Sequence, residues 1–122
     1  MRQQVAILPD GRRLHLQDGP IDLVVEAFGA AGDVRHAYAA AVARFSTILD
    51  ELCAELGALR RPIGPGPCPL AGRVARRMWH CAKPFADDGY VTPMAAVAGA
   101  VAEDILGAMT DAAPDLARAY VN

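Results

Sequence analysis

The sequence predicts an α+β fold in which antiparallel strands at the N-terminus are followed by three helices. Residues 4–27 consist of short apolar segments separated by proline and glycine turns, a pattern typical of paired strands. From residue 33 onward, apolar residues recur at three- and four-residue intervals, which indicates amphipathic helices. A chain of 122 residues can bury one hydrophobic core, so we expect residues 1–122 to form a single domain.

Three strands are expected before the first helix. Residues 4–8 and 12–17 flank Pro9-Asp10-Gly11, a turn sequence that predicts a β-hairpin. Residues 21–27 follow a second turn and are rich in β-branched side chains, which favours a third strand over a short helix. Residues 116–121 are compatible with the end of a helix or with a strand, and we favour a strand at 119–122.

A long first helix is expected from Asp33, which can cap it, to about Arg60, because Pro62 ends it. The apolar side chains expected on its buried face are Tyr38, Val42, Phe45, Leu49, Leu52, Leu56 and Leu59. Residues 62–69 then hold four prolines and two glycines, and we interpret them as an extended connector.

Two further helices are predicted. The second spans residues 70–82, with Val74 and Met78 facing inward. The third runs from Thr92-Pro93 to about Met109, with Thr92 as its N-cap and Pro93 at the first helical position. Its first backbone amides would form a seat for a phosphate or carboxylate, although a purely structural helix is the commoner interpretation. These amides belong to Met94, Ala95 and Ala96.

A basic stripe is expected on the second helix, formed by Arg73, Arg76, Arg77, His80 and Lys83. The formal net charge of −2 argues against a general nucleic-acid binder, so we favour a solvated basic face over an RNA or DNA contact. For a single anionic ligand, the binding and structural interpretations both stay open, because one arginine beside such a ligand is enough.

Several other functions are excluded by the motifs. The histidines and the three cysteines are isolated in sequence, so no zinc site or disulfide is expected, and we assign no metal ligand and no catalytic residue. The single serine lacks a nucleophile-elbow motif, and the proline-rich connector is not a phosphate loop. The chain contains no apolar run of bilayer length and no secretory signal, so we expect a cytoplasmic protein without membrane contact.

Residues 90–103 contain Pro93-Met94-Ala95-Ala96-Val97-Ala98-Gly99 and resemble the P-M-A-A-V-A-G signature of the UPF0280 (DUF375) family. Residues 5–12, 21–27 and 72–78 resemble the same family, so the similarity covers nearly the whole chain. That family is similar in fold to the ApbE-like, T-fold-related proteins. Their characterised members are Mg²⁺-dependent FAD:protein FMN transferases, which move FMN from FAD onto a Thr or Ser of a flavoprotein.

The resemblance implies a ligand cleft that takes FAD or FMN with Mg²⁺, or another anionic small molecule, and a transferase-like activity of the complete protein. The residues it would place at this cleft are Arg77, Met78, Thr92, Pro93, Met94, Ala95, Ala96, Gly99 and Asn122. Family members usually continue with Gly-Gly-Asp after the position of Asn122. The resemblance therefore implies that this chain corresponds to the N-terminal portion of a longer family domain.

Two alternative functions follow from the residues themselves. An open strand edge and a partly uncovered apolar helix would favour a non-enzymatic assembly domain, which oligomerises or is completed by another chain. A weaker alternative is a local RNA contact through Arg73, Arg76, Arg77 and Lys83.

Overall fold

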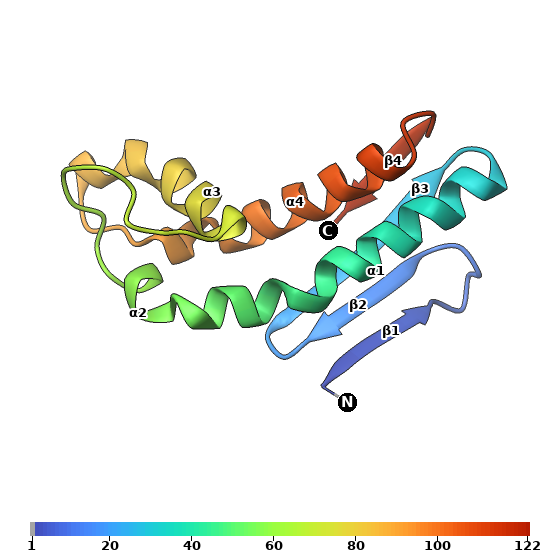
Figure 1. Ribbon diagram of the computed structural model, residues 1–122, viewed down its shortest axis with the longest axis horizontal. Helices are drawn as coiled ribbons and strands as arrows, with labels where there is room; N and C mark the ends of the chain where they lie inside the picture. The colour runs from blue at the N-terminus through green and yellow to red at the C-terminus, as the bar shows by residue number, and fades with distance from the viewer. Residues whose placement is uncertain (1) are drawn as a thin grey trace. The chain divides into compact units, whose positions relative to one another are not determined.

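The computed structural model describes residues 2–122 and confirms the α+β class, with a four-stranded antiparallel sheet and three main helices in this range (Figure 1). The elements are β1 (Gln3–Ile7), β2 (Leu14–Asp18), β3 (Ile21–Phe28), α1 (Ala31–Ala54), α2 (Leu56–Leu59), α3 (Arg73–Ala82), the 3₁₀ turns η1 (Lys83–Asp88) and η2 (Pro93–Ala96), α4 (Val97–Ala112) and β4 (Arg118–Val121). The chain divides into two compact units. Unit 1 comprises residues up to Leu49 together with Ala102–Asn122, and unit 2 comprises Asp50–Val101.

The sheet of unit 1 has the strand order β1-β2-β3-β4, and each neighbouring pair is antiparallel. The three predicted N-terminal strands are confirmed, and the C-terminal strand occupies 118–121 in place of 119–122. In β2, Leu14 and Leu16 are buried while His15 and Gln17 are half-buried, as the alternating pattern predicts. One face of the sheet therefore carries the core of this unit.

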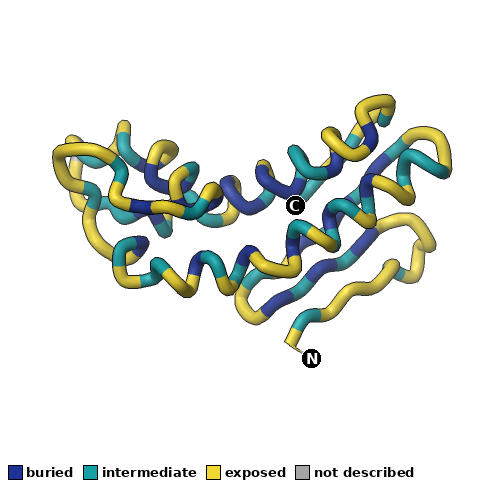
Figure 2. The backbone as a smooth tube through the Cα atoms, in the orientation of Figure 1, coloured by how far each residue is buried: buried dark blue, intermediate teal, exposed yellow. Residues whose placement is uncertain are grey.

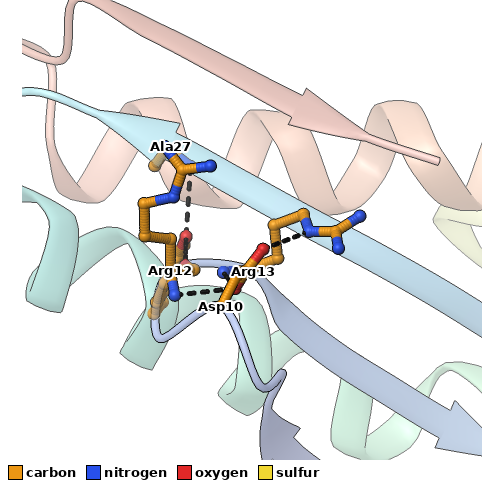
Figure 3. Close-up of polar contacts among 5 residues, drawn as sticks. Asp10, Arg12, Arg13 and Ala27 are labelled. Carbon is orange, nitrogen blue, oxygen red and sulfur yellow. Dashed lines mark hydrogen bonds and ion pairs between the residues drawn. The ribbon is translucent and has the colours of Figure 1, made fainter.

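The turn between β1 and β2 is organised by the side chain of Asp10 (Figure 3). Its Oδ1 accepts hydrogen bonds from the backbone N–H groups of Arg12 (2.9 Å) and Arg13 (3.0 Å). Its Oδ2 accepts a third from Nε of Arg13 at 2.6 Å. These bonds, the Arg12 amide first, hold the pKa of Asp10 well below its usual value. Gly11 has φ of +72°, a conformation that glycine adopts without strain.

A tyrosine of α1 fixes this turn to the sheet. The hydroxyl of Tyr38 donates to the carbonyl oxygen of Arg12 at 2.6 Å and accepts from the N–H of Ala27 at 3.2 Å. Desolvation raises the pKa of this hydroxyl. Tyr38 is half-buried, and its hydroxyl forms hydrogen bonds with two backbone groups, the carbonyl of Arg12 and the N–H of Ala27.

The buried face of α1 differs from the predicted one by about one residue (Figure 2). Phe45 and Leu52 are buried as expected, but Tyr38, Val42 and Leu49 are only half-buried. The fully covered positions of this helix are Ala37, Ala41, Phe45, Ile48 and Leu52. Of the other predicted residues, which lie in α2, Leu59 is buried and Leu56 is half-buried. The prediction was therefore wrong for the first half of α1, because small alanine side chains occupy the covered positions there.

The start of β1 is held by a buried carboxylate at the end of β2. Asp18 is fully buried, and its side chain forms an ion pair and hydrogen bonds with the Arg2 guanidinium. Nε2 of Gln3 donates to Asp18 Oδ2 at 3.0 Å and to the carbonyl oxygen of Ser46 in α1 at 2.6 Å. The hydrogen bond from Arg2, followed by that from Gln3, lowers the pKa of Asp18. These contacts tie the start of β1 to β2 and to α1.

Helix α4 contributes four of its apolar side chains to the buried residues, and it extends three residues beyond the predicted end at Met109. These side chains are Ala100, Val101, Ile105 and Met109. Asp104 on the same helix is 4% exposed and pairs with the guanidinium of Arg44 in α1. No helix among the described residues is both long and apolar enough to cross a bilayer.

The long first helix ends earlier than predicted. It stops at Ala54, and a separate turn of helix, α2, follows Glu55. The carboxylate of Glu55 accepts hydrogen bonds from the backbone amides of Ala71 (2.8 Å) and Gly72 (2.9 Å). These amides precede α3, whose observed start at Arg73 is three residues later than predicted. The expectation of one helix to Arg60 was wrong, because the chain leaves the α-helical conformation at Glu55, whose side chain binds the segment before α3.

We expect Glu55→Ala to lower the free energy of unfolding of unit 2 by about 1–2 kcal/mol, because two amides before α3 lose their acceptors. Glu55→Gln retains one acceptor oxygen and should retain part of this stability. Trp79 is the single tryptophan of the chain and lies in α3, so chemical denaturation followed by its fluorescence reports on this unit. An unchanged denaturation midpoint in Glu55→Ala would contradict the capping role.

Candidate ligand-binding site

A pocket of about 220 Å³ lies within unit 2. Three segments form it: the end of α2 with the connector that follows, one residue of α3, and one residue of η2. Its lining consists of Ala58, Arg61, Pro62, Ile63, Gly64, Pro65, Pro67, Pro69, Trp79 and Pro93. Half of these residues are prolines, whose rings fix the backbone angle φ and which donate no backbone hydrogen bond.

The connector that walls this pocket is fixed at two points. The N–H of Ile63 donates to the carbonyl oxygen of Val91 at 2.9 Å. The ammonium of Lys83 donates to the carbonyl oxygen of Gly64 at 3.0 Å and lies 5.6 Å from the centroid of the Trp79 ring, a cation–π distance. These contacts bring the proline-rich segment onto α3, where the indole of Trp79 forms an aromatic wall.

One positively charged residue, Arg61, lines the pocket, and Lys83 contacts the lining. Arg61 is exposed, and among the side chains that the structure describes no carboxylate pairs with its guanidinium. Lys83 lies beside the lining residue Gly64. A guanidinium with five free donors binds phosphate or carboxylate oxygens in a bidentate fashion. The lining of this pocket therefore combines prolines and one tryptophan with one arginine, and it exposes polar as well as apolar atoms.

The structure brings part of the predicted site together. Helix α3, which carries Arg77 and Met78, packs against η2, which carries Pro93. Met78 is fully buried in the core, as is Val74, so the inward face predicted for this helix is confirmed. Arg77 is half-buried. Of the predicted site residues, Pro93 is the one that belongs to the lining of the pocket described above.

The predicted anion seat at Thr92 takes a different form. Thr92 is the N-cap with an extended backbone, but its side chain forms no capping hydrogen bond. The segment Pro93–Ala96 is a 3₁₀ turn, and the N–H of Ala95 donates to the carbonyl oxygen of Thr92 at 3.2 Å. The expectation of a free Ala95 amide was wrong, because the tighter 3₁₀ turn uses an amide that an α-helical start would leave unpaired. Met94 and Ala96 lie in the same turn, half-buried.

Two predicted residues belong to other elements. Gly99 is exposed on α4, and a Cβ placed there would meet no atom within 4 Å, so this glycine does not mediate a close helix contact. Asn122 belongs to unit 1 and extends the β3–β4 ladder through its backbone. Its N–H donates to the oxygen of Val24 at 2.9 Å, and its oxygen accepts from the N–H of Val24 at 2.8 Å.

Intramolecular contacts occupy the basic stripe of α3. Nη1 of Arg76 donates to the carbonyl oxygen of Leu70 at 3.1 Å, and the ammonium of Lys83 is bound to Gly64. Arg73 and Arg77 are engaged in polar or electrostatic contacts as well. The ring of His80 packs edge-to-face against Trp79 at 5.0 Å. These contacts favour a role of the stripe in the fold over a free phosphate-binding surface.

Sequence reasoning missed Arg61 and Trp79. It interpreted residues 62–69 correctly as a connector without a phosphate loop, but assigned that connector no role. The sequence feature that could have drawn attention to this region is the proline-rich segment 62–69, which directly follows Arg60 and Arg61 and has a restricted backbone. Its partner, α3, becomes known only from the packing.

The described residues offer no preformed cluster of metal-ligating side chains. No group of three or more Asp, Glu, His or Cys side chains among them is arranged to hold a metal ion. The three cysteines are free thiols, and the nearest His–Asp contact, between His15 and Asp22 at 2.6 Å, is a surface pair on the sheet.

Comparisons with known proteins give one positive finding. No curated protein and no solved structure matches the chain. The family model described as AbpE bacteria matches residues 5–122. The finer identification with the UPF0280 proteins stays a prediction. Because the match extends over both compact units and nearly the full sequence, the chain belongs to the AbpE bacteria family.

Proposed function

We propose that this protein binds an anionic small molecule in the pocket of unit 2, with a flavin nucleotide as the leading ligand class. The observation that supports it most is that two residues line one pocket: Trp79, which supplies an indole, and Arg61, whose guanidinium pairs with no carboxylate among the described side chains. Pro93, from the segment that resembles the flavin-transferase-like family, lines the same pocket. An aromatic side chain for a ring and an arginine for a phosphate are the two groups that such a ligand needs.

The size of the pocket limits what it holds. Pockets for drug-sized ligands enclose roughly 300–1,000 Å³, and this pocket encloses about 220 Å³. It therefore suits one end of a nucleotide, such as a phosphate with part of a ring system, and not a whole FAD molecule. The rest of a longer ligand would lie outside the lining residues.

The proposal concerns binding. The lining consists of apolar residues, one arginine and one tryptophan, and none of them is a nucleophile or a general base at neutral pH. Transfer of FMN, which the family resemblance implies, would need a reacting group from outside this lining. For this reason we do not extend the proposal to a reaction.

Titration calorimetry with FMN, riboflavin and inorganic phosphate tests the proposal. FMN should bind saturably, riboflavin more weakly because it lacks the phosphate, and phosphate should change the fluorescence of Trp79. Arg61→Ala should raise the Kd for FMN by about tenfold to a hundredfold, since a charge-assisted bidentate contact is lost. Absence of saturable binding by all three compounds would overturn the proposal.

Arg60→Ala is the matched control. Arg60 is the exposed neighbour of Arg61 and does not line the pocket. Its substitution by alanine removes the same charge from the chain as Arg61→Ala does. Its Kd for FMN should stay within about twofold of the wild-type value. Equal weakening by both substitutions would show a general charge effect, and the pocket assignment would then be wrong.

A further inference from the structure

We propose that two copies of this chain associate through β1, edge to edge and antiparallel, around a two-fold axis at Val5. The association would join two four-stranded sheets into one continuous sheet. β1 is an edge strand, since its one neighbour in the sheet is β2. This inference rests on unit 1 and is independent of the ligand pocket, which lies in unit 2.

Strand β1 lacks the features that usually prevent edge strands from pairing with other chains. Natural edge strands are usually shielded by charged side chains, proline or a bulge. β1 reads Gln-Gln-Val-Ala-Ile and contains no charge and no proline, and its five residues pair with β2 without a bulge. The strand is also held in place, because Gln3 is bonded to Asp18 and to Ser46 of α1. It is therefore a preformed, uncharged template for another strand.

The ladder shows which backbone groups of β1 face outward. The N–H of Leu8 donates to the oxygen of Arg13 at 2.8 Å, so the pair that follows Ile7 and Leu14 in the register is hydrogen-bonded. Hydrogen-bonded pairs alternate along an antiparallel ladder. Gln4 and Ala6 consequently bond to β2. The N–H and C=O groups of Gln3, Val5 and Ile7 point to the open edge.

These outward groups are self-complementary under a two-fold axis. When Val5 faces Val5 of the second copy, Gln3 of each copy faces Ile7 of the other. Each of these facing pairs can exchange two backbone hydrogen bonds, because every residue presents one donor and one acceptor. The symmetry closes the assembly at two copies, whereas pairing β1 with a β4 edge would propagate into a filament.

The exposed apolar side chains of β1 also favour pairing with a second copy of the chain. Val5 is 49% and Ile7 52% exposed, although they lie opposite the buried Leu16 and Leu14 on the core face of the sheet. In the symmetric pairing, Val5 would contact Val5 of the second copy, and Ile7 would lie opposite Gln3 of the second copy, on the same face of the joined sheet as Val5. The other edge differs, because β4 carries the charged Arg118 and its core-facing Val121 is already half-buried. The second copy therefore fits β1 better than it fits β4.

The test is size-exclusion chromatography with light scattering, together with sedimentation to obtain the dimer Kd. We expect a dimer for the wild-type chain. Val5→Pro removes an N–H that bonds to nothing within the sheet, so the monomer should keep its fold while each dimer loses two hydrogen bonds. The dimer Kd should rise by about a hundredfold, tenfold for each lost bond.

Val121→Pro is the matched control on the opposite edge. Val24 is hydrogen-bonded to Asn122, so by the same alternation the N–H of Val121 also points outward. This variant should dimerise like the wild-type chain. Val5→Lys, which keeps every backbone group, should dissociate like Val5→Pro, and far-UV circular dichroism confirms folding of each variant. A monomeric wild-type chain, an unaffected Val5→Lys dimer, or dissociation by Val121→Pro would each overturn the proposal.

Discussion

Arg44→Ala should lower the free energy of unfolding by about 3–5 kcal/mol, which is among the largest effects expected for a single substitution in this chain. The reason is the environment of Asp104, which is 4% exposed and pairs with the Arg44 guanidinium between α1 and α4. Without Arg44, the buried carboxylate of Asp104 loses a charged partner. Both residues belong to unit 1, so denaturation followed by far-UV circular dichroism is the appropriate measurement.

A double variant separates the charge from the packing. Arg44→Met combined with Asp104→Leu removes both charges and keeps apolar volume, and it should be much more stable than Arg44→Ala alone. Arg44→Lys keeps the charge without the planar guanidinium and should lie between the wild-type chain and Arg44→Ala. If Arg44→Ala unfolds at the same denaturant concentration as the wild-type chain, the Arg44–Asp104 ion pair does not stabilise unit 1.

Phe45→Ala is expected to have an effect of similar size, about 3–5 kcal/mol, because the ring is 1% exposed in the core of unit 1 and its loss leaves a cavity. Leu49→Ala, one turn later on the same helix, is the control. Leu49 is only half-buried, so its truncation should lower the free energy of unfolding by about 1–2 kcal/mol. Equilibrium denaturation of both variants under the same conditions gives the comparison.

This pair of variants also decides between two faces of α1. The periodicity of large apolar residues places Phe45 and Leu49 on one buried face, whereas the structure covers Ala41, Phe45 and Ile48. Equal losses of stability in Phe45→Ala and Leu49→Ala would favour the face deduced from the sequence. A loss two or more times larger in Phe45→Ala agrees with the packing described above.

Local signals predicted the elements of this fold well. Turn residues at 9–11 and 18–20 delimit β1, β2 and β3, and the spacing of Val74 and Met78 gives the correct inner face of α3. The turns and the helix face depend on residues that are close in sequence, so they can be predicted from local sequence patterns. The end of α1 was missed because it depends on Glu55 reaching amides that lie 16 and 17 residues further along the chain.

The candidate site was predictable in part for the same reason. The motif at residues 93–99 identifies a segment, and Pro93 from that segment lines the pocket. Arg61 and Trp79 belong to segments with no motif of their own, and packing within unit 2 brings them to one cavity. The sequence also does not reveal that Ala95 uses its amide in a 3₁₀ turn, because helix type at a terminus is settled by a single hydrogen bond.

The proline-rich wall of the pocket has a consequence for how the protein would recognise a ligand. Proline restricts the unfolded chain, so residues 62–69 lose less conformational entropy on folding than an ordinary loop of the same length. Two hydrogen bonds, from Lys83 to Gly64 and from Ile63 to Val91, then hold the segment in place. A wall of this kind keeps its shape when the pocket is empty. The binding free energy of a ligand is then not spent on ordering a loop.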